Sequence, residues 1–367
     1  MRALTPFLIA LCFIKTASAT GFETDYAISV GNFYGYTDYS HPKPTPYKNN
    51  NINSSLNAYG KLSYNLSYNY IASLEGYFMI DSAKELENYN QGFWGEEVFA
   101  TLKTPLGEVS LGQDYNVAYN FATGAPNVGS FRVNNSEITN FINNPNWFAK
   151  DGKTSYKTLN STYINTDGAS IKINYTTPTY SGIKLGATFI PKVDSRSGLV
   201  SNNALYENEK AYILGALGEW YLSGFELSTS LGFADYDKND KEYSAGISIY
   251  RKGWTLGASY RKTKASKKDY KIDDVTMFDA YRDGYAYNMG LSYEIGPFAT
   301  GVSYFNSKAD SADYSNKIYS FSNAYRLNKN TTISLTLAHL EAKDLTDKTK
   351  AFAGIIGLEF ALWIKYV

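Results

Sequence analysis

The chain has 367 residues, with 35 basic and 35 acidic side chains, so its formal net charge is zero. Tyrosine and glycine are abundant, at 34 and 29 residues, and the mean hydropathy is −0.34. The balanced charge gives no support for nucleic-acid binding, and helical membrane spans are excluded because no run of about 18 apolar residues follows the N-terminus.

Residues 1–19 have the pattern of a secretory signal peptide. A positive end, an apolar stretch and a small-residue A-x-A motif precede Thr20, so we predict cleavage between Ala19 and Thr20. The alternative is a short anchoring helix. Cleavage removes the only cysteine, Cys12, and leaves 33 basic against 35 acidic residues. An exported, cysteine-free, tyrosine-rich chain fits the outer membrane of a Gram-negative bacterium, with one domain over 20–367.

From residue 22 onward, apolar and polar side chains alternate with the period of two that is typical of a β-strand. Within 284–306, for example, Tyr285, Tyr287 and Met289 share one face, whereas Ala286 and Asn288 share the other. A face of apolar and aromatic side chains opposite a face of small, polar ones indicates a strand between lipid and a water-filled lumen. We predict strands near residues 22–34, 55–65, 69–80, 93–103, 108–115, 168–177, 182–191, 210–221, 225–236, 242–251, 253–263, 284–294, 298–307, 316–327, 331–340 and 350–366.

The connections between these segments are alternately short and long. The short ones are Gly, Pro and Asn turns suited to hairpins. Six long, polar connections are predicted at 35–54, 81–92, 116–167, 192–209, 264–283 and 341–349. Such asymmetry and an even strand count are typical of bacterial membrane barrels. The predicted fold is therefore all-β, a sixteen-stranded antiparallel transmembrane β-barrel without a second domain.

The third long loop, 116–167, is about twice the length of any other, and loops this long usually have a function of their own. Phe121, Phe131 and Phe141 are spaced along it. A purely solvated loop would carry fewer aromatics, so we expect this segment to fold into the lumen, pack on the barrel wall and narrow the passage. The alternative is an exposed loop with a surface hairpin at 153–166.

Two segments resemble a known family. GEVSLGQDYNVAYN at 107–120 is similar to the strand-five signature of Gram-negative general diffusion porins, and the hairpin at 167–191 resembles the next one in the alphaproteobacterial members. The resemblance implies a homotrimer of sixteen-stranded barrels, each with its third loop as a constriction. It also implies passive diffusion of small hydrophilic solutes and ions, with no cofactor.

The chain departs from this family at three places. Gln113 stands where the family usually has Arg, and Asn127 where it often has an acid. Both departures predict weak ion selectivity. The family also ends on Phe, whereas seven residues follow Phe360 here. Either the last strand is longer, or a tail follows it.

The alternation of side chains between the two faces of a strand assigns several charged residues to the lumen. A charge facing lipid at mid-membrane would cost about 2–4 kcal/mol. These charges bias ion permeation, or they merely solvate a wide lumen. The candidate pore-wall residues are Gln113, Lys172, Lys184, Arg261, Arg326, Glu219 and Glu226. The candidate constriction residues are Asn127, Arg132, Glu137 and Lys150.

We therefore predict an outer-membrane porin, with a substrate-specific channel and a non-conducting adhesive barrel as alternatives. Stacked aromatics along the lumen would favour the substrate-specific channel. No catalytic motif or metal-ligand cluster is present, so neither an enzyme nor a metal site is expected. Besides lipid, lipopolysaccharide is a candidate partner for the basic residues of 262–271, unless they form a plain solvated loop.

Overall fold

The computed structural model describes residues 22–40, 49–67, 69–81, 93–142, 158–168, 170–193, 210–236, 240–264, 269–272, 275–278, 283–310, 313–343 and 347–366. Ala19, Thr20 and Lys150 lie outside these residues, so the predicted signal cleavage and one predicted constriction residue remain predictions.

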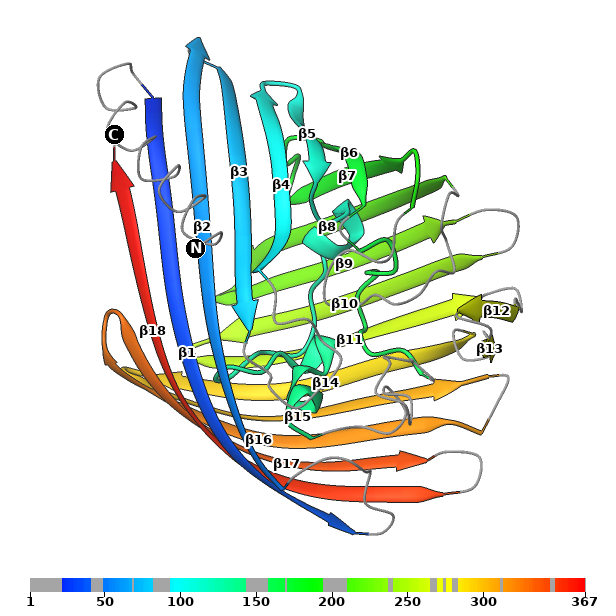
Figure 1. Ribbon diagram of the computed structural model, residues 1–367. Helices are drawn as coiled ribbons and strands as arrows, with labels where there is room; N and C mark the ends of the chain where they lie inside the picture. Colours follow the sequence, from blue (N-terminus) through cyan, green and yellow to red (C-terminus); the bar gives the residue numbers. More distant parts are fainter. Residues whose placement is uncertain are drawn as a thin grey trace.

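Sixteen strands close into an antiparallel barrel (Figure 1), which confirms the predicted fold. Each strand pairs with its neighbour in the chain, and β1 closes the wall against β18. The barrel strands are β1 (Phe22–Ser40), β2 (Asn50–Ser67), β3 (Tyr70–Asp81), β4 (Phe93–Thr104), β5 (Gly107–Gln113), β6 (Ile171–Thr176), β7 (Ile183–Ile190), β8 (Ala211–Leu222), β9 (Phe225–Asp235), β10 (Lys241–Arg251), β11 (Trp254–Lys264), β14 (Gly284–Ile295), β15 (Phe298–Ala309), β16 (Ser315–Asn328), β17 (Thr331–Lys343) and β18 (Lys348–Tyr366).

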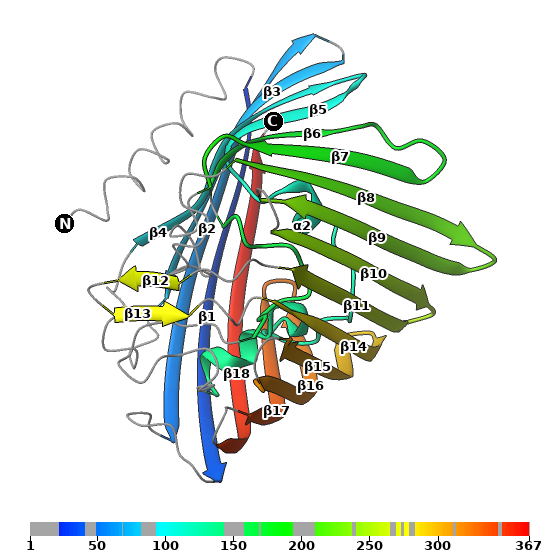
Figure 2. The same ribbon diagram turned by 90° about the vertical axis from the view of Figure 1, so that its right-hand side faces the viewer.

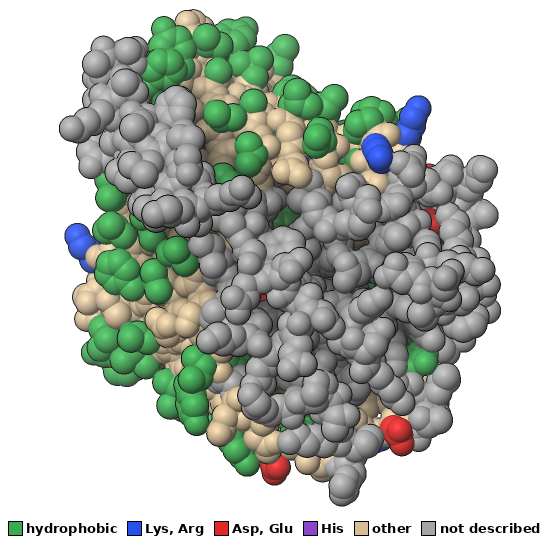
Figure 3. All heavy atoms as spheres, in the orientation of Figure 1, with side chains coloured by type: hydrophobic (Ala, Val, Ile, Leu, Met, Phe, Trp, Pro, Cys, Tyr) green, Lys and Arg blue, Asp and Glu red, His purple; other side chains and the backbone are tan. Residues whose placement is uncertain are grey.

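The two faces of the wall follow the alternation in the sequence. On β14, Met289 is 50% exposed and faces outward, whereas its neighbour Asn288 is 1% exposed and faces inward. The same contrast repeats around the barrel, and large apolar side chains stay exposed on the outer face. Figure 3 shows them along the left edge of the molecule, over β18, β1 and β2. The outer face is thus the surface suited to lipid.

The first strand is longer than predicted, whereas the last one matches its predicted range of 350–366 closely. β1 extends to Ser40 and pairs with β18 from Thr24↔Tyr366 to Ser40↔Lys350. The prediction of a loop from residue 35 was wrong, because Tyr34 and Tyr36 continue the outward aromatic face, with about half of each side chain exposed. The residues after Phe360 also continue β18 as a strand, and they close the barrel.

Short turns gather at one end of the barrel. Ser223-Gly224 and Lys252-Gly253 each join two strands with only two residues. Their φ values are 50° and 83° in the first turn, and 47° and 86° in the second. Two consecutive positive φ values make a type I′ turn, whose twist matches that of a hairpin, and glycine at the second position adopts it without strain. We refer to this as the short-turn end and to the opposite one as the long-loop end.

The fifth long loop, predicted at 264–283 without strands of its own, contains a small hairpin. β12 (Asp269–Ile272) and β13 (Val275–Phe278) pair from Asp269↔Phe278 to Ile272↔Val275, apart from the barrel. Strands of four residues carry too few alternations to be distinguished from loop in a sequence.

The third long loop contains three short helical turns: α2 (Val117–Asn120), η1 (Val133–Asn135) and η2 (Glu137–Asn140). Both ribbon views place α2 and the loop residues next to it within the ring of strands (Figures 1 and 2). No helix in the described part of the chain is long and apolar enough to cross a membrane.

Candidate functional site

The inner wall has glycines where the third loop touches it. On β10 and β11, Gly246 and Gly257 lie beneath the loop backbone. A Cβ atom at Gly246 would come within 1.9 Å of the Thr123 carbonyl oxygen, and one at Gly257 within 2.1 Å of the Gly124 carbonyl oxygen. The loop can therefore lie directly on the wall only because both positions lack a side chain.

Aromatic packing holds one side of the loop. Phe141 and Ile142 are buried against the inner faces of the closing strands, together with Phe33 of β1. The ring centroids of Phe131 and Phe141 lie 5.2 Å apart, and those of Phe33 and Phe131 5.4 Å apart. Burial of one such side chain contributes about 1.5–3 kcal/mol. The aromatics spaced along the loop thus dock it on the wall.

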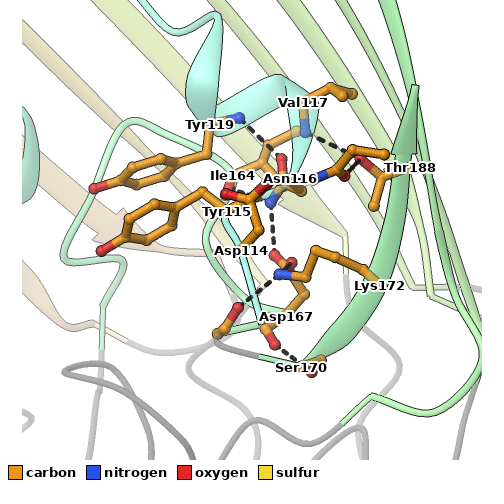
Figure 4. A network of polar contacts seen from close by, with 12 residues as sticks. Asp114, Tyr115, Asn116, Val117, Tyr119, Ile164, Asp167, Ser170, Lys172 and Thr188 are labelled. Carbon is orange, nitrogen blue, oxygen red and sulfur yellow. Dashed lines mark hydrogen bonds and ion pairs between the residues drawn. The ribbon is translucent and has the colours of Figure 1, made fainter. Parts of the chain in front are cut away.

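A buried ion pair anchors the loop where it rejoins the wall at β6. Lys172 Nζ lies 2.5 Å from Asp167 Oδ2, and both side chains are almost completely buried. Asn116 Nδ2 donates to the other carboxylate oxygen of Asp167 at 2.6 Å, so the start and the end of the loop are joined (Figure 4). Burying a charge is costly unless it is paired and hydrogen-bonded. This pair satisfies both conditions.

A second buried ion pair anchors segment 158–168. Arg261 of β11 lies 2.7 Å from Glu242 of β10, with side-chain exposures of 2% and 1%. Arg261 Nη1 also donates to the Tyr163 carbonyl and to Asn165 Oδ1, each at 2.7 Å. Thr166 Oγ1 accepts a bond from Arg261 Nη2 and donates to Glu242 at 2.5 Å. One guanidinium thus binds the wall and the loop together.

Neutral groups anchor the loop between these ion pairs. Asn288 Oδ1 on β14 accepts a hydrogen bond from the Ala125 backbone N–H at 3.2 Å. Its Nδ2 donates to Thr162 Oγ1 at 2.8 Å, and it also contacts Asn134. One buried asparagine therefore holds the loop at two places, since residue 125 lies in its first part and residue 162 in its last part.

The exposed face of the loop carries an ion pair between two predicted constriction residues. Arg132 Nε lies 3.0 Å from Glu137 Oε1, and the Arg132 backbone N–H donates to Glu137 Oε2 at 2.9 Å. The Arg132 side chain is 58% exposed and that of Glu137 is 25% exposed. Asn127, also exposed, accepts a bond from the Val133 N–H at 3.3 Å. Burial raises the pKa of Glu137, although Arg132 opposes this, and the Glu137 carboxylate raises the pKa of Arg132.

Three tyrosines lie beside this ion pair. The rings of Tyr115 and Tyr119 stack with centroids 4.2 Å apart at an angle of 14°, and Tyr163 meets Tyr119 edge to face at 5.7 Å. All three are half-buried. The sequence analysis missed them, because Tyr115 precedes Asn116, the N-cap of α2, and only Tyr119 lies within this four-residue helix.

A model of the Gram-negative porin family matches residues 29–345 of the sequence. The chain belongs to this family. It is an outer-membrane porin, and its barrel is a channel for passive diffusion. A comparison of the porin sequence with curated proteins finds no match.

Three solved structures share the fold at low sequence identity. OmpF of Salmonella typhi, in complex with daunomycin, is 12% identical over 93% of this chain and 98% of its own, with a TM-score of 0.65. An anion-selective porin from Comamonas acidovorans is 15% identical over 93% and 99%, with a TM-score of 0.56. OmpT of Vibrio cholerae, in its trimer form, is 10% identical over 93% and 100%, also with a TM-score of 0.56.

Six of the seven predicted wall residues of this porin face inward and fall into three groups. Lys172 and Arg261 face inward but are bound by the loop, so neither presents its charge to the lumen. Lys184 is half-buried on the inward side of β7. Three other predicted wall residues lie near the short-turn end and are exposed: Glu219, Glu226 and Arg326.

Gln113 does not lie on the pore wall, so that prediction was wrong. The register pairs it with Val98 of β4 and Ile171 of β6, which are 42% and 60% exposed on the outer face. Residues directly opposite each other in a sheet project to the same side. Along β5 it is Ser110 that faces inward, and Gln113 has the opposite parity.

The ion pair at residues 132 and 137 predicts a pH-dependent selectivity of the porin. Because the pKa of Glu137 is raised, it takes up a proton as pH falls, before a carboxylate with the ordinary value of about 4.3 does. Arg132 then keeps an uncompensated positive charge. We expect anion preference to increase on acidification, measured as the reversal potential in a KCl gradient. The Glu137→Gln variant should show the acidic behaviour at neutral pH, and an unchanged reversal potential in this variant would contradict the prediction.

Proposed function

We propose that this porin is a general diffusion channel in which the third loop forms the constriction. The observation that carries the proposal is the number of independent anchors between loop and wall. Aromatic packing, two buried ion pairs and the Asn288 contacts hold it across the inner face. A loop fixed in this way reduces the cross-section permanently, so small solutes pass and larger ones are excluded. Passage needs no energy source and no cofactor.

Weak ion selectivity is part of the same proposal. The wall cations Lys172 and Arg261 are neutralised by Asp167 and Glu242, and the exposed cation Arg132 is paired with Glu137. Charge at a narrow passage biases permeation, but paired charges largely cancel. The remaining candidates on the inward side lie mostly at the short-turn end, away from the described part of the loop.

Planar-bilayer recording tests this function directly. We expect large, ohmic current steps and a reversal potential close to zero in a salt gradient at neutral pH. A barrel that inserts but stays silent would be the structural or adhesive alternative.

We also propose that the chain is no enzyme, since the inner polar groups described above hold the loop. Cleavage between Ala19 and Thr20, with a mature domain over 20–367, can be checked by sequencing the N-terminus of the purified protein.

A homotrimer is supported by the outer face of β1 and β2. Ser54 Oγ donates to Asn32 Oδ1 at 2.9 Å on this face, among exposed apolar side chains. Polar groups facing hydrocarbon are costly, whereas a subunit interface accommodates them. The trimer form of OmpT is consistent with this assembly. We expect unheated protein to migrate as a trimer in detergent gels. Ser54→Trp should abolish that species, whereas Ala245→Trp, on the outer face of β10, should not.

Contact with lipopolysaccharide is the last part of the proposal. Lys262 and Lys264 project outward at the long-loop end of β11, although Lys262 is ion-paired with Asp310. Ammonium groups at this level can meet the phosphates of the outer leaflet. The double variant Lys262→Gln, Lys264→Gln should retain less phosphate through purification than the parent does. Equal phosphate content would favour a plain solvated rim.

A further inference from the structure

The tyrosines of the third loop form a compact aromatic surface, the loop triad of Tyr115, Tyr119 and Tyr163. Two rings stack and the third meets them edge to face. The rings of Tyr115 and Tyr119 point away from the buried Lys172 cluster toward the interior of the barrel (Figure 4). Half-buried tyrosines at this place are more than wall packing, since they present apolar ring surface beside the path of a solute.

The backbone beneath the triad is rigid. The Tyr115 carbonyl accepts a bond from Asn174 Nδ2 of β6 at 2.9 Å, and the Tyr119 backbone N–H donates to Asn116 Oδ1 at 2.9 Å. The Val117 N–H donates to Thr188 Oγ1 of β7 at 3.0 Å. The rings are therefore positioned before any solute arrives, which reduces the entropy cost of binding.

Planar polar groups lie beside the rings. Asn135 Nδ2 donates to the Tyr119 hydroxyl at 3.1 Å. The Tyr115 and Tyr119 hydroxyls lie within electrostatic range of the Arg132 guanidinium. The Tyr163 hydroxyl lies within electrostatic range of the Glu137 carboxylate. The guanidinium offers several N–H donors in a plane, and the carboxylate offers acceptors only. Together they provide donors and acceptors with no net charge.

We propose that the loop triad, with Arg132 and Glu137, is a weak binding subsite for a cyclic sugar. An uncharged pyranose has an apolar face that packs on an aromatic ring, and hydroxyls at its rim that both donate and accept. A charged solute has no such match, because the ion pair is neutral. The inference rests on the proposed function, since it concerns solutes that pass the constriction, and it adds saturable binding to plain diffusion.

Ion-current measurements with maltose as the probe test this inference on the unmodified protein. We expect current through the open channel to fall with maltose concentration along a saturating curve, with added current noise. Sorbitol, an acyclic polyol, should lower the current only in proportion to viscosity. If both solutes follow viscosity alone while the channel conducts, the inference is overturned. A channel that never conducts overturns the proposed function, and this inference with it.

Variants locate the effect. Tyr119→Leu keeps an apolar side chain but removes the ring, and should raise the half-saturating maltose concentration about two- to tenfold, which corresponds to the loss of one aromatic contact. Tyr119→Phe keeps the ring and should bind nearly as the parent does, which also controls for folding. Tyr180→Leu is the matched control, because Tyr180 is 64% exposed at the short-turn end. An unchanged half-saturating concentration in Tyr119→Leu would contradict the assignment.

Discussion

Replacement of Arg261 by methionine is expected to free segment 158–168 from the wall and to increase both conductance and current noise. The change leaves Glu242 buried without its cation and removes the donors to Tyr163 and Asn165. Removal of one partner of a buried ion pair costs about 3–5 kcal/mol. That is roughly two to four orders of magnitude in the equilibrium between docked and released loop. Single-channel recording measures the effect, and faster proteolysis within the third loop supports it independently.

Two variants control this experiment. Arg251→Met removes an arginine at the short-turn end, where its guanidinium lies 4.2 Å from the Phe225 ring centroid rather than on the third loop. It should leave conductance unchanged. The double variant Arg261→Met, Glu242→Met should recover much of the parental behaviour, because apolar replacement of both partners is often close to neutral. Parental conductance and noise in Arg261→Met alone would show that the loop does not depend on this pair.

The wall was predictable because its physics is local. A strand between lipid and lumen must alternate, so residues such as Met289 and Asn288 show their direction in the sequence itself. The errors occurred at the end of a terminal strand and where a strand became short. Tyr34 and Tyr36 extend β1 through a stretch that also holds Gly35, Thr37 and Asp38, and the four-residue strands β12 and β13 have no barrel face to bury.

The site was less predictable because its partners are distant in the chain. Parity gives the direction of Lys172 and Arg261 but does not show that the loop covers them. The two partners of Arg261, Glu242 and segment 163–166, meet it only through tertiary structure. Gln113 was assigned by analogy to a family signature, although it lies two residues after Leu111 on the same face of the strand, which already indicates the outer face. The tyrosine stack depends on a four-residue helix inside a long loop, which periodicity cannot reveal at that length.

The buried charges have a consequence for permeation. In many channels, inward-facing cations set selectivity, but here two of them hold the third loop on the wall instead. Mutation of Lys172 or Arg261 should therefore change the size of the passage more than its ion preference. The opposite holds for the exposed Arg132 and the half-buried Glu137, which make their ion pair within the loop.

Replacement of Gly257 by alanine is expected to reduce conductance, the opposite of the effect expected for Arg261. The new Cβ atom would lie 2.1 Å from the Gly124 carbonyl oxygen, so the loop backbone has to move away from β11 toward the lumen. Ser230 and Asn288 hold the loop on both sides of that point, which limits its release. Overpacking of this kind costs about 1–3 kcal/mol, so the midpoint of thermal unfolding should also fall.

The matched control is Gly354→Ala on β18, where the nearest atom to the new Cβ, Leu337 Cδ2, is 3.6 Å away. It makes the same chemical change in a strand without touching the loop, and should keep parental conductance and stability. Gly246→Ala, with a Cβ 1.9 Å from the Thr123 carbonyl oxygen, should repeat the effect of Gly257→Ala. If both inner variants conduct like the control, the loop cannot lie directly on these two strands in the membrane. If both conduct more, the new methyl group detaches the loop, and the remaining anchors are weaker than their number indicates.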